Sequence, residues 1–213
     1  MPSGNRRLTA LNKREKSMLR RYIVMFMTGI FLANNAFAGV TDDVKKTVDE
    51  VVRIVADKNL KQHEQERRQA LKKAISVIFD YSEMAKRSLG KHWNQRSPAE
   101  RKQFADLFAS LLENSYAGKI EFYNNEKIDY LKETVDGNYA EVKSKVITRK
   151  RDEFSLDYRL LKENGKWMVY DVVIEGVSLV SNYRTQFNKI ITTNGYNELV
   201  KKLQTKTDEL KAL

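Results

Sequence analysis

Two acidic residues, Asp171 and Glu175, interrupt an apolar stretch near the C-terminal end of the sequence, WMVYDVVIEGVSLVSNYRTQF at 167–187. The first half of this stretch is typical of a strand, in which alternate residues project from one face. Two carboxylates on one face can act as general acid and general base in hydrolysis. In the structural alternative, Asp171 accepts a hydrogen bond from Tyr158 or another nearby side chain, and Glu175 lies at a cavity mouth or caps the following helix. We favour the structural interpretation, because buried acids usually have such partners.

Other chemistry has no support in the sequence. There is no cysteine, so a thiol nucleophile, a disulfide and a lipid-bearing cysteine are all excluded. The two histidines, His63 and His92, have no close metal-ligand spacing, and neither a G-x-S-x-G motif nor a glycine-rich phosphate loop occurs. We therefore expect no catalytic residues, no metal and no cofactor.

The first 38 residues are organised like a secretory signal peptide. Residues 1–21 carry seven Lys or Arg and one acid, residues 22–32 are eleven uncharged residues, and Ala36-Phe37-Ala38 has the small-x-small pattern of a cleavage site. Eleven residues fall short of the roughly 20 that span a bilayer. We predict cleavage after Ala38, and translation can start at Met1 or Met18.

The predicted mature chain, 39–213, has the length of a single domain. Removal of residues 1–38 lowers the net charge from +11 to +5. A mildly basic secreted protein meets anionic lipid and glycan surfaces rather than nucleic acid, so we expect no nucleic-acid partner.

Helical periodicity dominates the first half of the mature chain. Helices are predicted at 41–60, at about 63–78, from Asp80 to Gly90, and from Ser97 onward. Thr41 is the expected N-cap of the first helix. In the fourth, Ser97 and Glu100 form a capping box around Pro98 at the first helical position.

After about residue 125 the period changes to two. Strands are predicted at 128–135, 139–149, 153–161 and 167–175, and helices at 177–193 and 197–210. Asn164-Gly165 predicts a two-residue hairpin turn. With that turn, Leu160 faces Val169, Tyr158 faces Asp171, Leu156 faces Val173 and Phe154 faces Glu175.

This order of elements predicts an α+β fold. N-terminal helices, a curved antiparallel sheet of four or slightly more strands, and closing C-terminal helices would surround an apolar pocket. Periodicity alone does not distinguish such a pocket from solid core.

Two blocks of the sequence have a distinctive order and spacing of residues. The first contains Phe79-Asp80, Met84-Ala85, Leu89-Gly90, Trp93 and the capped helix with Phe104, Phe108, Leu111 and Tyr116. The second contains Trp167, Tyr170-Asp171 and Glu175-Gly176-Val177-Ser178. Together these blocks resemble the MlaC family, the periplasmic phospholipid-binding proteins of the Mla lipid-transport system, also described as toluene-tolerance auxiliary proteins.

The resemblance implies a periplasmic, non-enzymatic carrier that holds a diacyl phospholipid with its tails in an apolar pocket and its headgroup at the mouth. Its implied partners are an inner-membrane ABC transporter with a ring of lipid-handling domains and an outer-membrane lipoprotein–porin complex. Such a carrier helps to maintain outer-membrane lipid asymmetry, and we expect a monomer.

Candidate site residues follow from the apolar faces and the resemblance together. The expected lipid-binding side chains are Met84, Leu89, Trp93, Phe104, Phe108, Leu111, Tyr116, Val142, Val146, Leu156, Tyr158, Val169, Val173, Val177, Leu179 and Tyr183. Arg149, Lys150 and Arg151, at the tip between two strands, are expected to contact the headgroup or a partner. Asp171, Glu175 and Gly176 are expected to be structural.

Two alternatives from other classes remain open. A secreted hydrolase or isomerase that uses Asp171 and Glu175 would lose a reaction in Asp171→Asn. A non-lipid adaptor with a solidly packed interior would bind protein or glycan and carry no lipid.

Overall fold

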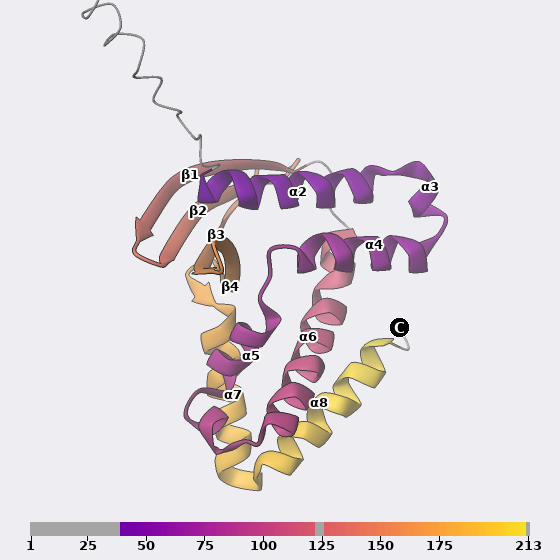
Figure 1. Cartoon of the computed structure of the whole chain (residues 1–213). Coiled ribbons are helices and arrows are strands. Elements are labelled where there is room, and N and C mark those ends of the chain that lie inside the picture. The colour runs from indigo at the N-terminus through magenta and orange to yellow at the C-terminus, as the bar shows by residue number, and fades with distance from the viewer. Residues whose placement is uncertain (1–38, 122–125, 212–213) are drawn as a thin grey trace, which may run out of the picture. The chain divides into compact units, whose positions relative to one another are not determined.

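Helices begin and end the described part of the chain, and a five-stranded antiparallel sheet lies between them (Figure 1). The computed structural model describes residues 39–121 and 126–211. The N-terminal elements are α2 Val40–Ala56, α3 Lys58–Lys61, α4 Glu64–Ser76, α5 Tyr81–Leu89, η1 Gly90–Gln95 and α6 Pro98–Glu121. They are followed by β1 Lys127–Asp136, β2 Tyr139–Ile147, β3 Glu153–Glu163, β4 Lys166–Ile174, β5 Val177–Ser178, α7 Leu179–Asn194 and α8 Tyr196–Lys211. The predicted α+β fold is confirmed. The predicted signal peptide and its cleavage site lie outside the described residues.

The capping signals place most helix starts correctly. The Ser97 backbone N–H donates to Glu100 Oε2 at 2.7 Å, and the Glu100 N–H donates to Ser97 Oγ at 3.3 Å, as the capping box predicts. At the start of α2 the prediction is wrong, because Gly39 and not Thr41 is the N-cap. The Thr41 hydroxyl instead donates to Glu133 Oε2 of β1 at 2.6 Å, which fastens the helix to the sheet.

The strands follow one another in the order β1-β2-β3-β4-β5, and every pair is antiparallel. Two of the pairs contain a bulge, at Leu131 in β1 and at Tyr170 in β4, where one extra residue interrupts the register. Such bulges bend a strand and increase its twist, which accounts for a sheet curved enough to border a cavity.

The bulge at Tyr170 corrects the predicted register of β3 and β4. The Asn164-Gly165 turn is confirmed, with φ values of 49° and 81°, and Leu160 faces Val169 as expected. Beyond the bulge the pairing slips by one residue. Tyr158 therefore faces Val172 rather than Asp171, and Asp171 faces Arg159. A slip of one residue moves side chains to the opposite face of a strand, so the remainder of β4 is inverted relative to the prediction.

The same bulge connects the sheet to the helices. Val169 accepts a hydrogen bond from the Asp80 N–H at 2.9 Å and donates one to the Ile78 carbonyl at 2.7 Å. This parallel bridge holds the segment before α5 against β4 and fixes the position of Phe79 between them.

The apolar interior is divided into three clusters. In the first, α5 to α8 pack around aromatic rings, with Phe187 edge-on to both Phe104 and Phe108 at 5.6 Å between ring centroids. The second joins the start of α2 to the sheet through Val44, Val142 and their neighbours. The third lies between the end of α2 and α4. In Figure 1, α5 to α8 lie side by side. Helix α2 extends away from the sheet, and α4 runs back beneath α2.

Candidate functional site

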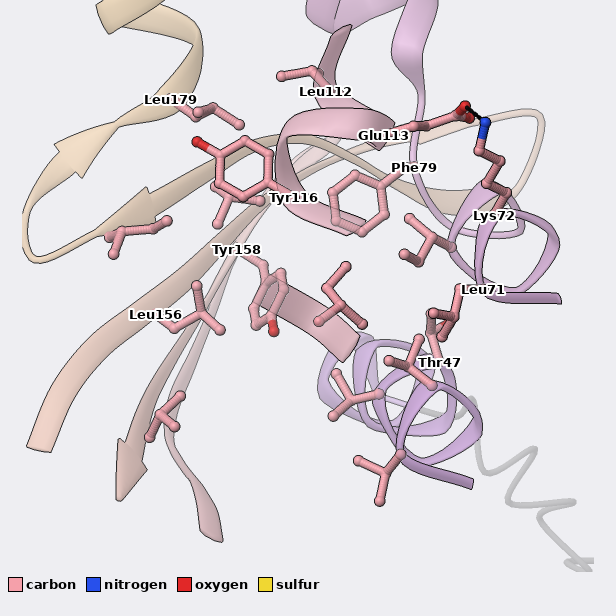
Figure 2. A pocket seen from close by; sticks show the side chains of 18 of the residues that line it. Thr47, Leu71, Lys72, Phe79, Leu112, Glu113, Tyr116, Leu156, Tyr158 and Leu179 are labelled. Carbon is pink, nitrogen blue, oxygen red and sulfur yellow. Dashed lines mark ion pairs between the residues drawn. The ribbon is translucent and has the colours of Figure 1, made fainter. Parts of the chain in front are cut away.

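A cavity of about 530 Å³ lies where the three clusters meet, between the sheet, α2, α4 and the C-terminal half of α6 (Figure 2). Its volume falls within the range of roughly 300–1,000 Å³ that is typical of ligand pockets. Most of the wall is aliphatic or aromatic, including Val48 and Val51 of α2, Leu71 and Ile75 of α4, and Phe79. The cavity therefore has the chemistry of an apolar ligand-binding site.

The sheet side of the wall is formed by alternate residues of neighbouring strands. β3 contributes Leu156 and Tyr158, which are labelled in Figure 2. β4 contributes Val172 and Ile174. Burial raises the pKa of the Tyr158 hydroxyl far above its ordinary value, so this ring is neutral at any physiological pH. Burial has the same effect on the pKa of Tyr81, which Glu113 raises further.

Charged groups occupy one part of the wall. Lys72 Nζ of α4 lies 3.0 Å from Glu113 Oε2 of α6, and this ion pair is drawn as a dashed line in Figure 2. One turn earlier on α4, Arg68 also lines the cavity and pairs with Glu64 at 2.6 Å. Both cations are accessible to an anionic group at the edge of the cavity.

Asp171 is buried on the side of β4 away from the cavity. Its Oδ1 accepts a hydrogen bond from the Val180 backbone N–H at 3.0 Å, and its Oδ2 accepts one from Ser178 Oγ at 2.6 Å. Arg159 Nη1 lies 3.3 Å from Oδ2. Tyr158 is not the partner, because the bulge turns the two side chains to opposite faces, whereas the expectation of another nearby side chain is met by Ser178 and Arg159. Two of these partners, Ser178 and Val180, connect Asp171 to the start of α7. The third, Arg159, connects it to the neighbouring strand β3.

Glu175 and Gly176 form the turn between β4 and β5, with φ values of 49° and 77°. The Glu175 N–H donates to the Ser155 carbonyl at 3.1 Å, and Glu175 Oε1 accepts from the Ser155 N–H. Glu175 does not cap the following helix, because the cap of α7 is Ser178, whose hydroxyl accepts from the Ser181 N–H. Neither Asp171 nor Glu175 lines the cavity, so the geometry separates the two acids from its contents.

The predicted lipid-binding residues are distributed over the cavity wall and the cores. Met84, Tyr116, Val146, Leu156, Tyr158 and Leu179 line the cavity. Leu89, Trp93, Phe104, Phe108, Leu111 and Tyr183 belong to the aromatic cluster of α5 to α8. Val142 and Val169 belong to the cluster between α2 and the sheet. Val173 is buried outside the cavity wall, and Val177 is 59% exposed.

The basic tip lies next to the cavity. Thr148, the residue before the tip, lines the wall, and Arg149, Lys150 and Arg151 are exposed. Arg151 has a φ of 68°, and its N–H donates to the Thr148 carbonyl at 2.9 Å, which closes the turn between β2 and β3.

Sequence reasoning missed the helical side of the wall. Val48, Val51 and Val52 of α2 and Ile75 of α4 line the cavity but were not among the expected lipid-binding residues. No sequence pattern distinguishes a side chain that faces a cavity from one that faces a packed core. Val172 and Ile174 were also missed, and Val173 was expected in their place, because the bulge was not foreseen.

No group of three or more potential metal ligands occurs among the described residues. Within the same part of the chain, no helix combines the length and apolarity required to cross a bilayer. The fold and the cavity together define an α+β protein that encloses an apolar pocket between a curved sheet and helices from both ends of the chain.

Known proteins share this arrangement. The family model described as MlaC protein matches residues 45–205. The chain belongs to the MlaC family.

Individual relatives agree with this assignment. The Haemophilus influenzae protein named intermembrane phospholipid transport system binding protein MlaC is 30% identical over 121 residues, which is 54% of this chain and 56% of that protein. The match thus spans only about half the length of this relative. Toluene tolerance protein ttg2D of Pseudomonas putida is 26% identical over 87% of each chain. A phospholipid-binding protein from Ralstonia solanacearum, solved in complex with a phospholipid, has a TM-score of 0.74 and 29% identity, covering 82% of this chain and 99% of that chain.

Proposed function

We propose that the protein is a periplasmic phospholipid carrier that acts after removal of residues 1–38, with residues 39–213 as its lipid-binding domain. The observation that supports this most directly is the apolar cavity, in a chain whose fold matches that of a phospholipid-bound relative. The acyl tails would occupy the cavity, and the headgroup would remain at its edge. The protein would need neither a catalytic residue nor a cofactor.

The physical chemistry of the cavity supports this cargo. Each methylene group moved from water into an apolar cavity gains about 0.8 kcal/mol. Acyl tails of ordinary length therefore gain ample free energy without any specific polar contact. A carrier that binds by apolar burial accepts different tails and can release them to another apolar site.

As a carrier, the protein would move phospholipid between an outer-membrane lipoprotein–porin complex and the lipid-handling ring of an inner-membrane ABC transporter. This exchange would maintain the lipid asymmetry of the outer membrane. The protein would act as a monomer, since the described residues of one chain are sufficient to line a cavity of about 530 Å³.

Native mass spectrometry of protein purified without detergent tests the proposal, together with organic extraction of the same sample. The expected result is a discrete added mass that extracts as phospholipid. Ile75→Trp, which fills the cavity from α4, should reduce the loaded fraction. Val77→Trp is the control, because Val77 lies two residues further on and is 71% exposed. It should leave the loaded fraction unchanged. A protein that remains bare, and that takes up no phospholipid from vesicles, would exclude the carrier function.

Transfer between membranes requires a second measurement. Fluorescent phospholipid in donor vesicles should appear in acceptor vesicles faster when the wild-type protein is added, and Ile75→Trp should show little of this acceleration. Equal transfer by both proteins would mean that the cavity does not carry the lipid.

A further inference from the structure

The cavity wall contains two cationic side chains among the described residues that line it, Arg68 and Lys72. They lie four residues apart on α4, so they project from the same face of the helix. The apolar side chains Leu71 and Ile75 of that face line the adjoining part of the wall. This helix therefore presents positive charge and apolar surface side by side to one cavity.

The two cations also reach solvent. The side chain of Lys72 is 41% exposed and that of Arg68 is 31% exposed, although both contribute to the wall. A cation that both lines a cavity and reaches solvent can contact a polar group that remains outside the cavity. A ligand with its tails inside and a polar group outside would place that polar group near these two residues.

Lys72 has hydrogen-bonding capacity beyond its present ion pair. Lys72 Nζ contacts Glu113 Oε2 at 3.0 Å, but an ammonium group has three donors, so Lys72 can bind an additional oxygen for which Glu113 competes. Arg68 Nη2 contacts Glu64 Oε1 at 2.6 Å, and the two side chains are 31% and 60% exposed. Ion pairs between exposed side chains are weak, so an incoming anion can compete with Glu64 for Arg68.

We propose that Arg68 and Lys72 form a subsite for the phosphate group of the bound lipid, with Glu113 as the intramolecular competitor for Lys72. This inference rests on the proposed carrier function. It assigns the headgroup to α4, whereas the sequence directed attention to the exposed tip at Arg149, Lys150 and Arg151.

The charge balance of the subsite fits a carrier. Glu113 and Glu126 also line the wall, so the two cations of the wall are matched by two carboxylates. A phosphate diester carries one negative charge and would be held by a few charge-assisted hydrogen bonds. Such a subsite distinguishes a phospholipid from an uncharged lipid with the same tails, but it does not hold the headgroup tightly enough to prevent release.

The test compares phosphatidylglycerol and diacylglycerol with identical acyl chains, presented together in equal amounts in vesicles. The bound ratio is read by native mass spectrometry. In Lys72→Gln/Glu113→Gln, which removes the ion pair and preserves its shape, the preference for phosphatidylglycerol should fall about ten-fold, as expected from the loss of one charge-assisted hydrogen bond. Arg68→Gln should lower it in the same direction.

Glu113→Gln alone should raise the preference, because it leaves Lys72 without its competitor. A residue that served only the packing of the helices would not produce this opposite sign. Lys102→Gln is the matched control, since Lys102 pairs with Asp106 at 2.6 Å on an exposed part of α6 outside the cavity wall. It should leave the ratio unchanged.

The outcomes distinguish a failure of the carrier function from a failure of the phosphate subsite alone. If the wild-type protein takes up neither lipid, the carrier function itself fails. If it takes up both, and the ratio is the same in the wild type and all variants, only the phosphate subsite is overturned. Undiminished diacylglycerol uptake also identifies each variant as folded. If inorganic phosphate alone protects the wild-type protein from unfolding as well as the phospholipid does, the subsite serves free phosphate and the proposal is likewise overturned.

Discussion

The carboxylate of Asp171, near the end of β4, accepts a hydrogen bond from the backbone N–H of Val180 in the first turn of α7 at 3.0 Å. The same carboxylate accepts from Ser178 Oγ, and Ser178 is the N-cap of that helix. Asp171 therefore determines where α7 begins relative to the sheet, and Leu179, between its two partners, is held at the cavity wall.

We expect Asp171→Asn to destabilise the protein by about 2–3 kcal/mol, because the amide group directs a donor at Ser178 or Arg159 in a buried position. Urea denaturation at neutral pH measures this loss. Asp208→Asn, in an exposed side chain that pairs with Gln204, is the control and should have almost no effect. Unchanged stability together with loss of a chemical activity would instead favour the enzyme alternative.

The bulge at Tyr170 predicts opposite behaviour for two adjacent valines. Val172→Phe enlarges a side chain of the cavity wall and should lower the phospholipid load per folded molecule several-fold. Val173→Phe enlarges a side chain buried outside the cavity wall, and should cost about 1–3 kcal/mol through overpacking without lowering the load of the folded fraction. Native mass spectrometry and denaturation of both variants separate the two effects, and the reverse pattern would contradict the observed register.

Arg87 of α5 lies over the ring of the bulged Tyr170, with its guanidinium carbon 3.9 Å from the ring centroid. A double-mutant cycle of Arg87→Met and Tyr170→Leu should give a coupling energy of about 0.5–2 kcal/mol. The cycle is required because Arg87 also pairs with Glu83 at 2.8 Å, which the single substitution of Arg87 disrupts. Additive effects of the two substitutions would show that the contact has no energetic role.

Stability should decrease at high pH because of the buried tyrosines. Burial raises the pKa of Tyr158 and Tyr81 in the folded protein, whereas both ionise near pH 10 when unfolded. Their contribution is therefore fully present below about pH 10 and is lost as the pH rises further. Denaturation midpoints measured across this range should fall, and Tyr158→Phe should reduce the slope. Ionisation of every tyrosine near pH 10 in the folded protein, followed by absorbance, would contradict this expectation.

Local signals in the sequence predicted much of the fold. The capping box at Ser97 and Glu100 and the Asn164-Gly165 turn depend on neighbouring residues alone, and both are confirmed. The bulge at Tyr170 instead follows Val169, whose backbone pairs with Ile78 and Asp80 about ninety residues earlier. No local sequence pattern indicates this long-range pairing. The predicted register of β3 and β4 was therefore wrong beyond the bulge.

The site was less predictable than the fold for a related reason. Val48 has the same helical periodicity as the buried Val44, and only the packing of distant elements leaves Val48 at a cavity. The Lys72–Glu113 pair likewise joins two helices that are separated in sequence. Apolar faces were thus predictable, but their division between core and cavity was not.

The division of the interior into three clusters has a consequence for cooperativity. Where the clusters meet, a cavity takes the place of many contacts that a solid core would make, and residues such as Phe79 and Ile120 of α6 provide the links that remain. Acyl chains would fill that gap and join the clusters, so the cargo would serve as part of the interior. Calorimetry should then record a single sharp transition for the loaded protein and a broader or divided one after delipidation. Lipid release would amount to a partial melting of the layer formed by α2 and α4.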